Sequence, residues 1–204
     1  MSSFIAGIDV SHYNGTIDWA AAARNASFAF IKATEGVHMP DPRFRANWQG
    51  AKDAGILRGA YHFFSPKEDG ASQADYFLKS IDLAVGDLPP VLDLETAGAE
   101  NPRHVAGEAA CWVSAVQAAT GRAPIIYTTA SFWRQIGNPP NPAGCRLWVA
   151  HYGVPAPALP HPWEHWTFWQ FSQTGSCAGI SGAVDTNHFQ GTSEDLRALT
   201  IPEK

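Results

Sequence analysis

Two carboxylates two residues apart are the strongest chemical signal in the sequence. Asp93 and Glu95 end the apolar run Pro89-Pro90-Val91-Leu92-Asp93-Leu94-Glu95, which predicts a strand over Pro90–Glu95. Side chains at positions i and i+2 of a strand point to one face, so both carboxylates should project together. Neighbouring carboxylates repel, and the repulsion raises the proton affinity of at least one of them. Such a pair suits acid–base chemistry at neutral pH, although a solvated strand end that caps the next loop is an alternative.

Two further aspartates stand in the first and last predicted strands. Asp9 lies within Gly7-Ile8-Asp9-Val10-Ser11, and Asp185 lies within Ala183-Val184-Asp185-Thr186-Asn187. The first and last strands of a closed barrel are neighbours, so Asp9 and Asp185 would flank one side of its mouth, across from the other pair. Each aspartate taken alone is more often a turn or cap residue, as expected for Asp18, Asp41 and Asp69 at helix starts.

Aromatic and amide side chains near the same predicted strand ends indicate a ligand class. Sugars present apolar C–H faces and hydroxyl groups, so a carbohydrate site needs flat rings and hydrogen-bonding groups. The candidates are Tyr61, Tyr127, Trp148, Tyr152 and Gln170, with Trp169 beside the last of these. Core packing is the alternative for any tryptophan or tyrosine, and it is the interpretation favoured for Trp19, Trp48 and Trp112.

Apolar runs alternate with amphipathic stretches along the chain. The runs predict about eight strands, at 4–10, 28–33, 57–64, 90–95, 123–128, 146–151, 167–172 and 184–189. The amphipathic stretches predict about five helices, at 17–24, 41–54, 71–85, 102–120 and 194–199. This order predicts an α/β fold, a modified (incomplete) β/α barrel whose last strands are joined by loops. An open doubly wound sheet is the competing architecture, but the first strand is not followed by its glycine-rich phosphate fingerprint.

Length and composition exclude several function classes. A chain of 204 residues, 45% of them hydrophobic, fits one domain over 1–204 or at most two small ones. A net charge of −5 without a basic stripe argues against a nucleic-acid partner. No apolar run reaches the roughly 18 residues of a membrane span, so no stable membrane insertion is expected. The histidines form no metal-binding motif and no G-x-S-x-G elbow occurs, so we expect neither a metal nor another cofactor.

A series of short motifs resembles the glycoside hydrolase family 25 muramidases, a class of lysozymes. Each motif is weak alone, but their joint occurrence in this order is specific. They are Gly7-Ile8-Asp9-Val10-Ser11, Ile17-Asp18-Trp19, Phe30-Ile31-Lys32-Ala33-Thr34-Glu35-Gly36, Ala54-Gly55-Ile56, Gly59-Ala60-Tyr61-His62-Phe63, Leu92-Asp93-Leu94-Glu95, Ile126-Tyr127, Leu147-Trp148-Val149-Ala150, Trp169-Gln170-Phe171 and Val184-Asp185-Thr186-Asn187.

The resemblance implies a peptidoglycan hydrolase that cleaves the β-1,4 bond between N-acetylmuramic acid and N-acetylglucosamine with net retention. Glu95 matches the acid/base carboxylate of the family, and Asp9, Asp93 and Asp185 match its other acidic positions. Asp93 would act as the nucleophile or would orient the 2-acetamido group of the substrate. The implied substrate-binding residues are Tyr61, Tyr127, Trp148, Tyr152, Gln170 and Asn187.

The implied partner is the glycan strand of peptidoglycan, at the cell wall or in the periplasm, and we expect a monomer. The sequence shows neither wall-binding repeats nor a signal peptide, so release would use a lysis pore, a dedicated secretion system or prior removal of a leader. A secreted effector would be paired with an inhibitor or immunity protein. The alternatives are a non-catalytic glycan-binding module and a glycosidase that acts on chitin-like glycans. The odd set Cys111, Cys145 and Cys177 leaves a thiol unpaired, and Cys111 is expected to be buried.

Overall fold

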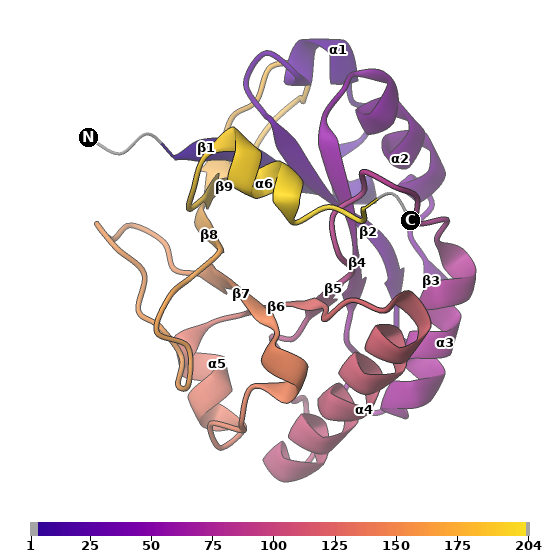
Figure 1. Cartoon of the computed structure of the whole chain (residues 1–204), viewed down its shortest axis with the longest axis vertical. Helices are drawn as coiled ribbons and strands as arrows, with labels where there is room; N and C mark the ends of the chain where they lie inside the picture. The colour runs from indigo at the N-terminus through magenta and orange to yellow at the C-terminus, as the bar shows by residue number, and fades with distance from the viewer. Residues whose placement is uncertain (1–3, 203–204) are drawn as a thin grey trace.

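The alternating apolar runs form a ring of strands in the computed structural model, which describes residues 4–202 (Figure 1). All eight expected strands are present within this range, together with one short additional strand. They are β1 (Ile5–Val10), β2 (Phe28–Glu35), β3 (Met39–Pro40), β4 (Leu57–Phe63), β5 (Val91–Asp93), β6 (Ile125–Thr128), β7 (Arg146–Ala150), β8 (Phe168–Gly175) and β9 (Val184–Phe189).

The ring closes because β1 pairs with strands from both ends of the sheet. β1 runs parallel to β2, with Gly7 opposite Phe28, and antiparallel to β9, with Asp9 opposite Asp185. Parallel pairing continues from β2 through β4, β5, β6 and β7 to β8, and β9 is antiparallel to β8 as well. The predicted α/β barrel is therefore confirmed, and the open doubly wound sheet is excluded.

Helices cover only part of this barrel. The α-helices are α1 (Trp19–Ala22), α2 (Phe44–Asp53), α3 (Gly70–Ser80), α4 (Pro102–Thr120), α5 (Ala130–Gln135) and α6 (Ser193–Ala198), and the 3-10 turns are η1 (His12–Asn14) and η2 (Pro142–Gly144). Figure 1 shows α1 to α4 beside the early strands, whereas loops connect β7, β8 and β9. The barrel is incomplete in the part of the chain where the sequence predicts missing helices.

Some elements differ from the sequence prediction. The short helix α5 was not predicted; the side chain of Thr129 caps it by accepting from Phe132 N at 3.0 Å. The two-residue strand β3 folds back on the end of β2 and stands outside the ring. Helix α3 ends at Ser80 and not near residue 85, because Ile81 already has an extended backbone. Helical periodicity is weak over the six residues of α5, and a two-residue strand has no alternation to detect.

Side-chain alternation along the strands separates two cores. Inward-facing aromatic rings fill the barrel, where Phe30 stacks on Trp148 at 4.4 Å and Phe28 packs against Phe168 at 5.1 Å between ring centres. Outward-facing residues such as Ile31 and Leu92 pack against the helices. Leu196 and Leu199 belong to the interior cluster, so α6 and the residue after it close the barrel at the end where β9 finishes.

The burial of the tryptophans and cysteines follows from their place in these cores. Trp19, Trp48 and Trp112 are buried, as predicted. The prediction for Cys111 is wrong: its side chain is exposed on α4, because the buried stripe of that helix includes the next residue, Trp112, and leaves Cys111 outside it. All three cysteines are free thiols. Across residues 4–202, no helix is both long and apolar enough to cross a membrane.

A glycine at the start of α3 lets this helix pack closely on α4. A Cβ atom on Gly70 would lie 1.9 Å from the backbone oxygen of Glu108, while Gly70 N donates to Glu108 Oε2 at 2.8 Å. At Gly107, the preceding residue in α4, an added Cβ would meet nothing within 4 Å. The two glycines therefore offer the same substitution in opposite environments.

We expect Gly70→Ala to lower the free energy of unfolding by about 1–3 kcal/mol, because the backbones of α3 and α4 must separate. Gly107→Ala should raise it by about 0.5–1 kcal/mol, because alanine favours the helix more than glycine does. Urea denaturation of both variants and the wild type measures these changes. If both substitutions changed the free energy of unfolding equally, helix propensity and not close packing would determine the effect of replacing Gly70.

Candidate active site

A cavity of about 300 Å³ opens at the carboxyl ends of the parallel strands. This end of a β/α barrel is where catalytic and binding residues gather. Asp9, Asp93, Glu95 and Asp185, the four carboxylates expected from the sequence, all line it. A second cavity of about 270 Å³ lies between α4 and α5, but it is lined by apolar side chains and has no titratable group to do chemistry.

Asp9 is held by two amide donors from neighbouring strands. Gln170 Nε2 and Asn187 Nδ2 both donate to Asp9 Oδ2, at 2.8 Å and 2.7 Å. Burial raises the pKa of Asp9 to about 7, and the negative charge of Asp185 adds to the rise, whereas the two amide donors oppose it. Asp9 is therefore a carboxyl group of fixed orientation that exchanges its proton near neutral pH.

Asp185 reaches the cavity because β9 is antiparallel to its neighbours. It is the second residue of β9, yet it lies opposite Asp9, which is the fifth residue of β1. In a parallel strand, a residue at this position would lie at the far end of the barrel. Burial raises the pKa of Asp185, and its contact with Asp9 acts in the opposite direction.

Asp93 and Glu95 converge although the strand is shorter than expected. β5 ends at Asp93, and Leu94 N donates to Tyr127 O at 2.9 Å, which keeps the chain alongside β6 up to Glu95. Asp93 Oδ1 is buried without a hydrogen-bond partner in the described residues. Burial raises the pKa of Asp93 well above its usual value, and the charges of Glu95 and Asp9 add to the rise. Asp93 therefore lines the cavity with a carboxyl group that has one oxygen without a hydrogen-bond partner within residues 4–202.

Glu95 reaches solvent at the mouth of the cavity, while its carboxyl group is partly enclosed by the cavity wall. This partial burial raises the pKa of Glu95; the nearby positive charge of Lys32 lowers it, and the negative charge of Asp185 raises it. The exposed edge of the group remains open to a ligand. Glu95 therefore combines an elevated proton affinity with access to substrate, which is what a general acid needs.

Lys32 is a cavity residue to which the sequence analysis assigned no role. It faces inward from β2, and it is the one lysine or arginine among the described residues that line the cavity. Its Nζ pairs with Glu35 Oε2 at 2.6 Å and lies 4.8 Å from the centre of the Phe63 ring. A lysine within the apolar run Phe28–Ala33 was the signal that could have revealed it.

The predicted tyrosines converge on one glutamine. Tyr127 OH and Tyr152 OH donate to Gln170 Oε1 at 2.8 Å and 2.6 Å, and the amide nitrogen of the same side chain holds Asp9. Tyr61 and Trp148 also line the cavity. The structure thus brings together five of the six residues expected to bind substrate, and Gln170 links the aromatic wall to the acidic cluster.

Asn187 and Trp169 lie elsewhere than the sequence predicts. Asn187 is completely buried behind Asp9, donates to it and accepts from Trp148 Nε1 at 2.8 Å, so its amide has no access to a ligand in the cavity. Trp169 faces outward because its neighbour Gln170 faces inward, and it packs in a cluster on the outer side of the barrel. Alternation along a strand forbids two adjacent residues from facing the same cavity.

Four further residues line the cavity although the sequence did not predict them there: Ser11, Tyr13, Phe63 and Gln173. Tyr13 and Gln173 lie outside the recognised motifs, in segments whose position depends on the closed barrel. Within residues 4–202, no group of three or more His, Cys, Asp or Glu side chains is arranged to hold a metal ion. Carboxyl groups of unequal environment that share one cavity are suited to proton transfer.

Comparison with known proteins identifies relatives over nearly the whole chain. The sequence model described as "Glycosyl hydrolases family 25" matches residues 8–180. "Lysozyme M1" from Streptomyces globisporus is 43% identical over 97% of this chain and 72% of its own length. "N,O-diacetylmuramidase" from Chalaropsis sp is 36% identical over 89% of this chain and 96% of its own length. A crystal structure of the bacterial lysozyme from Streptomyces coelicolor, 42% identical, covers 98% of both chains with a TM-score of 0.93.

We expect Asp9→Asn to stabilise the protein above neutral pH. The folded protein raises the pKa of Asp9 from 3.8 to about 7, so ionising this group costs stability as the pH rises from about 4 to about 7. An asparagine oxygen in the place of Oδ2 can still accept from both amides. Unfolding at pH 8 should therefore require about 2–4 kcal/mol more for the variant, with little difference at pH 4. Chemical denaturation at both pH values measures the change, and an identical pH dependence of the two proteins would contradict it.

Proposed function

The chain belongs to the glycosyl hydrolases of family 25, and we propose that it is a muramidase that cleaves the β-1,4 bond between N-acetylmuramic acid and N-acetylglucosamine in peptidoglycan. The observation that carries the proposal is the convergence of Asp93 and Glu95 in one cavity rimmed by aromatic rings. Relatives named as a lysozyme and as an N,O-diacetylmuramidase support the choice of substrate.

Glu95 is the general acid and then the general base of the proposed reaction. Its raised pKa favours the protonated form that an acid needs, and its exposed edge can approach the glycosidic oxygen. In the first step, Glu95 gives this proton to the oxygen of the leaving sugar as the bond to the anomeric carbon breaks. In the second step, the ionised carboxylate takes a proton from the attacking water, which restores the acid.

The 2-acetamido group of the substrate is the proposed nucleophile. Its carbonyl oxygen forms a bond to the anomeric carbon while the leaving group departs, and water later attacks the same carbon from the opposite side, so the configuration is retained. Asp93 is proposed to orient the group, because it lines the cavity and its carboxyl group has spare capacity to accept from the acetamido N–H. Direct attack by Asp93 is the second route, but its strongly raised pKa makes the carboxylate that this route needs less available.

The remaining cavity residues hold the substrate and its catalytic groups. The negative charge of Asp9 acts on Asp93 and that of Asp185 acts on Glu95, and Lys32 offsets part of the negative charge near both. Tyr61, Tyr127, Trp148, Tyr152 and Gln170 are the proposed contacts to sugar rings and hydroxyls. Asn187 acts through Asp9 and Trp148, so we assign it to positioning and not to substrate contact.

The site of action follows from the substrate. The chain provides one catalytic domain, which works on the cell wall as a monomer and is released through a lysis pore, by a secretion system or after removal of a leader. Delivery as an effector would pair it with an inhibitor or immunity protein that covers the cavity. Its net charge of −5 provides no general attraction to an anionic wall, so binding depends on the cavity and its rim.

Glu95→Gln should reduce the clearing of purified cell walls by about 10²–10⁴-fold, because the amide cannot donate a proton to the leaving oxygen. The matched control is Glu194→Gln, the same chemical change at an exposed position at the start of α6. We expect the control to clear walls at the wild-type rate. Clearing by Glu95→Gln at that rate would reject Glu95 as the acid.

The products should carry muramic acid at their reducing ends and should first appear as the β-anomer. Mass spectrometry of reduced fragments identifies the terminal sugar, and NMR during the reaction follows the anomer. Reducing-end glucosamine would refute muramidase activity, and an initial α-anomer would refute both retaining routes. Faster cleavage of chitin oligomers would favour the chitin-like alternative, and binding without any new reducing ends would favour a glycan-binding module.

A further inference from the structure

A tyrosine at the rim of the cavity is almost fully exposed to solvent. Tyr13 lines the cavity, and 84% of its surface is accessible, more than for any other large hydrophobic residue in the described part of the chain. It lies in the 3-10 turn η1 (His12–Asn14), directly after β1. An aromatic ring left in water at the entrance of a binding cavity contributes nothing to the core, so its contact area is free for a ligand.

The backbone of this turn is fixed from several directions. The Ser11 side chain caps it and Asn14 Oδ1 accepts from Ser11 N at 3.0 Å, which forms a reciprocal capping box. Asn14 Nδ2 also donates to Ala183 O at 3.4 Å, next to the start of β9. The position of Tyr13 is therefore set before any ligand arrives, so little ordering entropy is lost on binding.

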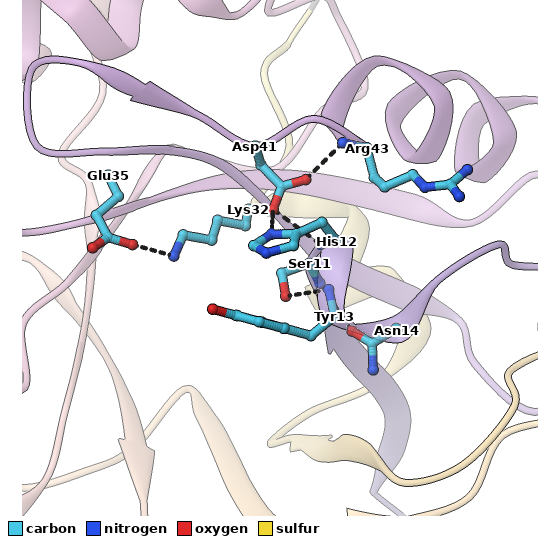
Figure 2. A network of polar contacts seen from close by, with 8 residues as sticks. All are labelled: Ser11, His12, Tyr13, Asn14, Lys32, Glu35, Asp41 and Arg43. Atoms are coloured by element: carbon cyan, nitrogen blue, oxygen red, sulfur yellow. Dashed lines mark hydrogen bonds and ion pairs between the residues drawn. The ribbon is translucent and has the colours of Figure 1, made fainter.

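A buried carboxylate holds the residue beside Tyr13. Asp41 Oδ2 accepts from His12 N at 2.9 Å and contacts His12 Nδ1 at 2.7 Å, and Asp41 Oδ1 accepts from Arg43 N at 2.9 Å (Figure 2). The Asp41 side chain has no exposed surface. The expectation that Asp41 simply begins a helix is wrong: α2 starts at Phe44, and Asp41 instead ties the β3–α2 connection to the turn after β1.

The His12 ring supports the Tyr13 ring. Their centres lie 4.0 Å apart with an angle of 36° between the planes. Figure 2 shows the chain of contacts from Asp41 to His12 and the Tyr13 ring that extends beside them. Asp41 thus holds His12 through two polar contacts, and the His12 ring packs against the Tyr13 ring. The rest of the Tyr13 ring faces solvent at the cavity rim.

We propose that Tyr13, supported by His12, is a stacking platform at the cavity rim for a sugar of the glycan strand beyond those held at the carboxylates, and that Asp41 is the positioning residue of this platform. The proposal rests on the proposed function and extends the binding site from the carboxylates to the rim. A neutral sugar ring is the ligand that fits, because its apolar C–H face covers the tyrosine while its hydroxyls stay hydrated. The four carboxylates in the adjoining cavity disfavour an anionic ligand such as a nucleic acid.

The test compares glycan fragments of increasing length. In the Glu95→Gln background, which prevents cleavage, we expect Tyr13→Ala to weaken binding of purified six-sugar peptidoglycan fragments about tenfold, the loss of about 1.4 kcal/mol of contact. Binding of two-sugar fragments should change less than about twofold, because the proposal places the Tyr13 contact on a sugar beyond those held at the carboxylates. Tyr13→Trp should restore the affinity for long fragments, because it replaces one flat ring with another.

Asp41→Asn tests the positioning role. With Glu95 intact, both Asp41→Asn and Tyr13→Ala should raise KM on soluble glycan strands several-fold while kcat changes little, because the catalytic carboxylates are untouched. The double variant should be no worse than Tyr13→Ala alone, since both changes disable one platform. Full additivity would reject the coupling. Thermal unfolding of each variant separates this effect from a general loss of stability.

The matched control is Phe4→Ala, which removes another exposed aromatic ring, at the opposite end of β1 and outside the cavity. It should leave binding unchanged at every fragment length. If the wild type cleaves walls and Tyr13→Ala binds long fragments equally well, or loses affinity equally for all lengths, the platform is rejected and the proposed function stands. If the wild type releases no fragments and Glu95→Gln binds none, the proposed function fails and the platform fails with it.

Discussion

The closure of the barrel at β1 is the constraint on which the rest of the structure depends. β1 is held between parallel β2 and antiparallel β9, and Gly7 makes this possible because a Cβ atom there would lie 2.4 Å from the Phe28 ring. Phe28 then occupies the barrel interior beside Phe168. Closure places the ends of β1 and β9 next to each other, and with them Asp9 and Asp185. Without it, the two pairs of carboxylates would not share a cavity.

Gathering four carboxylates in one cavity costs stability, and the surrounding residues limit that cost. Gln170 and Asn187 supply Asp9 with two donors, and Lys32 places a positive charge near Asp93 and Glu95. These donors do not fully compensate for burial, so the pKa values of all four carboxyl groups stay raised. These raised pKa values are useful in catalysis, because a carboxyl group that keeps its proton near neutral pH can protonate a leaving group.

The same closure links the catalytic cavity to its rim. The turn after β1 carries Tyr13, and that turn is tied to β9 through Asn14 and to the region before α2 through Asp41. Gln170 connects the tyrosines on the other side of the cavity with Asp9. Hydrogen bonds therefore join Asp9 to the tyrosines on one side of the cavity, and a separate set of bonds fixes the turn that carries Tyr13 on its rim.

The amino-acid sequence alone determined the local features: the eight apolar runs, the alternation that turns Asp93 inward, and the carboxylates and tyrosines at strand ends. These follow from periodicity and residue chemistry, which act over a few neighbouring positions. Tertiary structure decided what depends on contacts distant in the chain. The antiparallel direction of β9 brought Asp185 to the cavity, the pairing of β8 with β9 buried Asn187 behind Asp9, and closure put Lys32 and Tyr13 on the cavity wall. No local pattern encodes strand direction or barrel closure, because both are set by the packing of the whole ring.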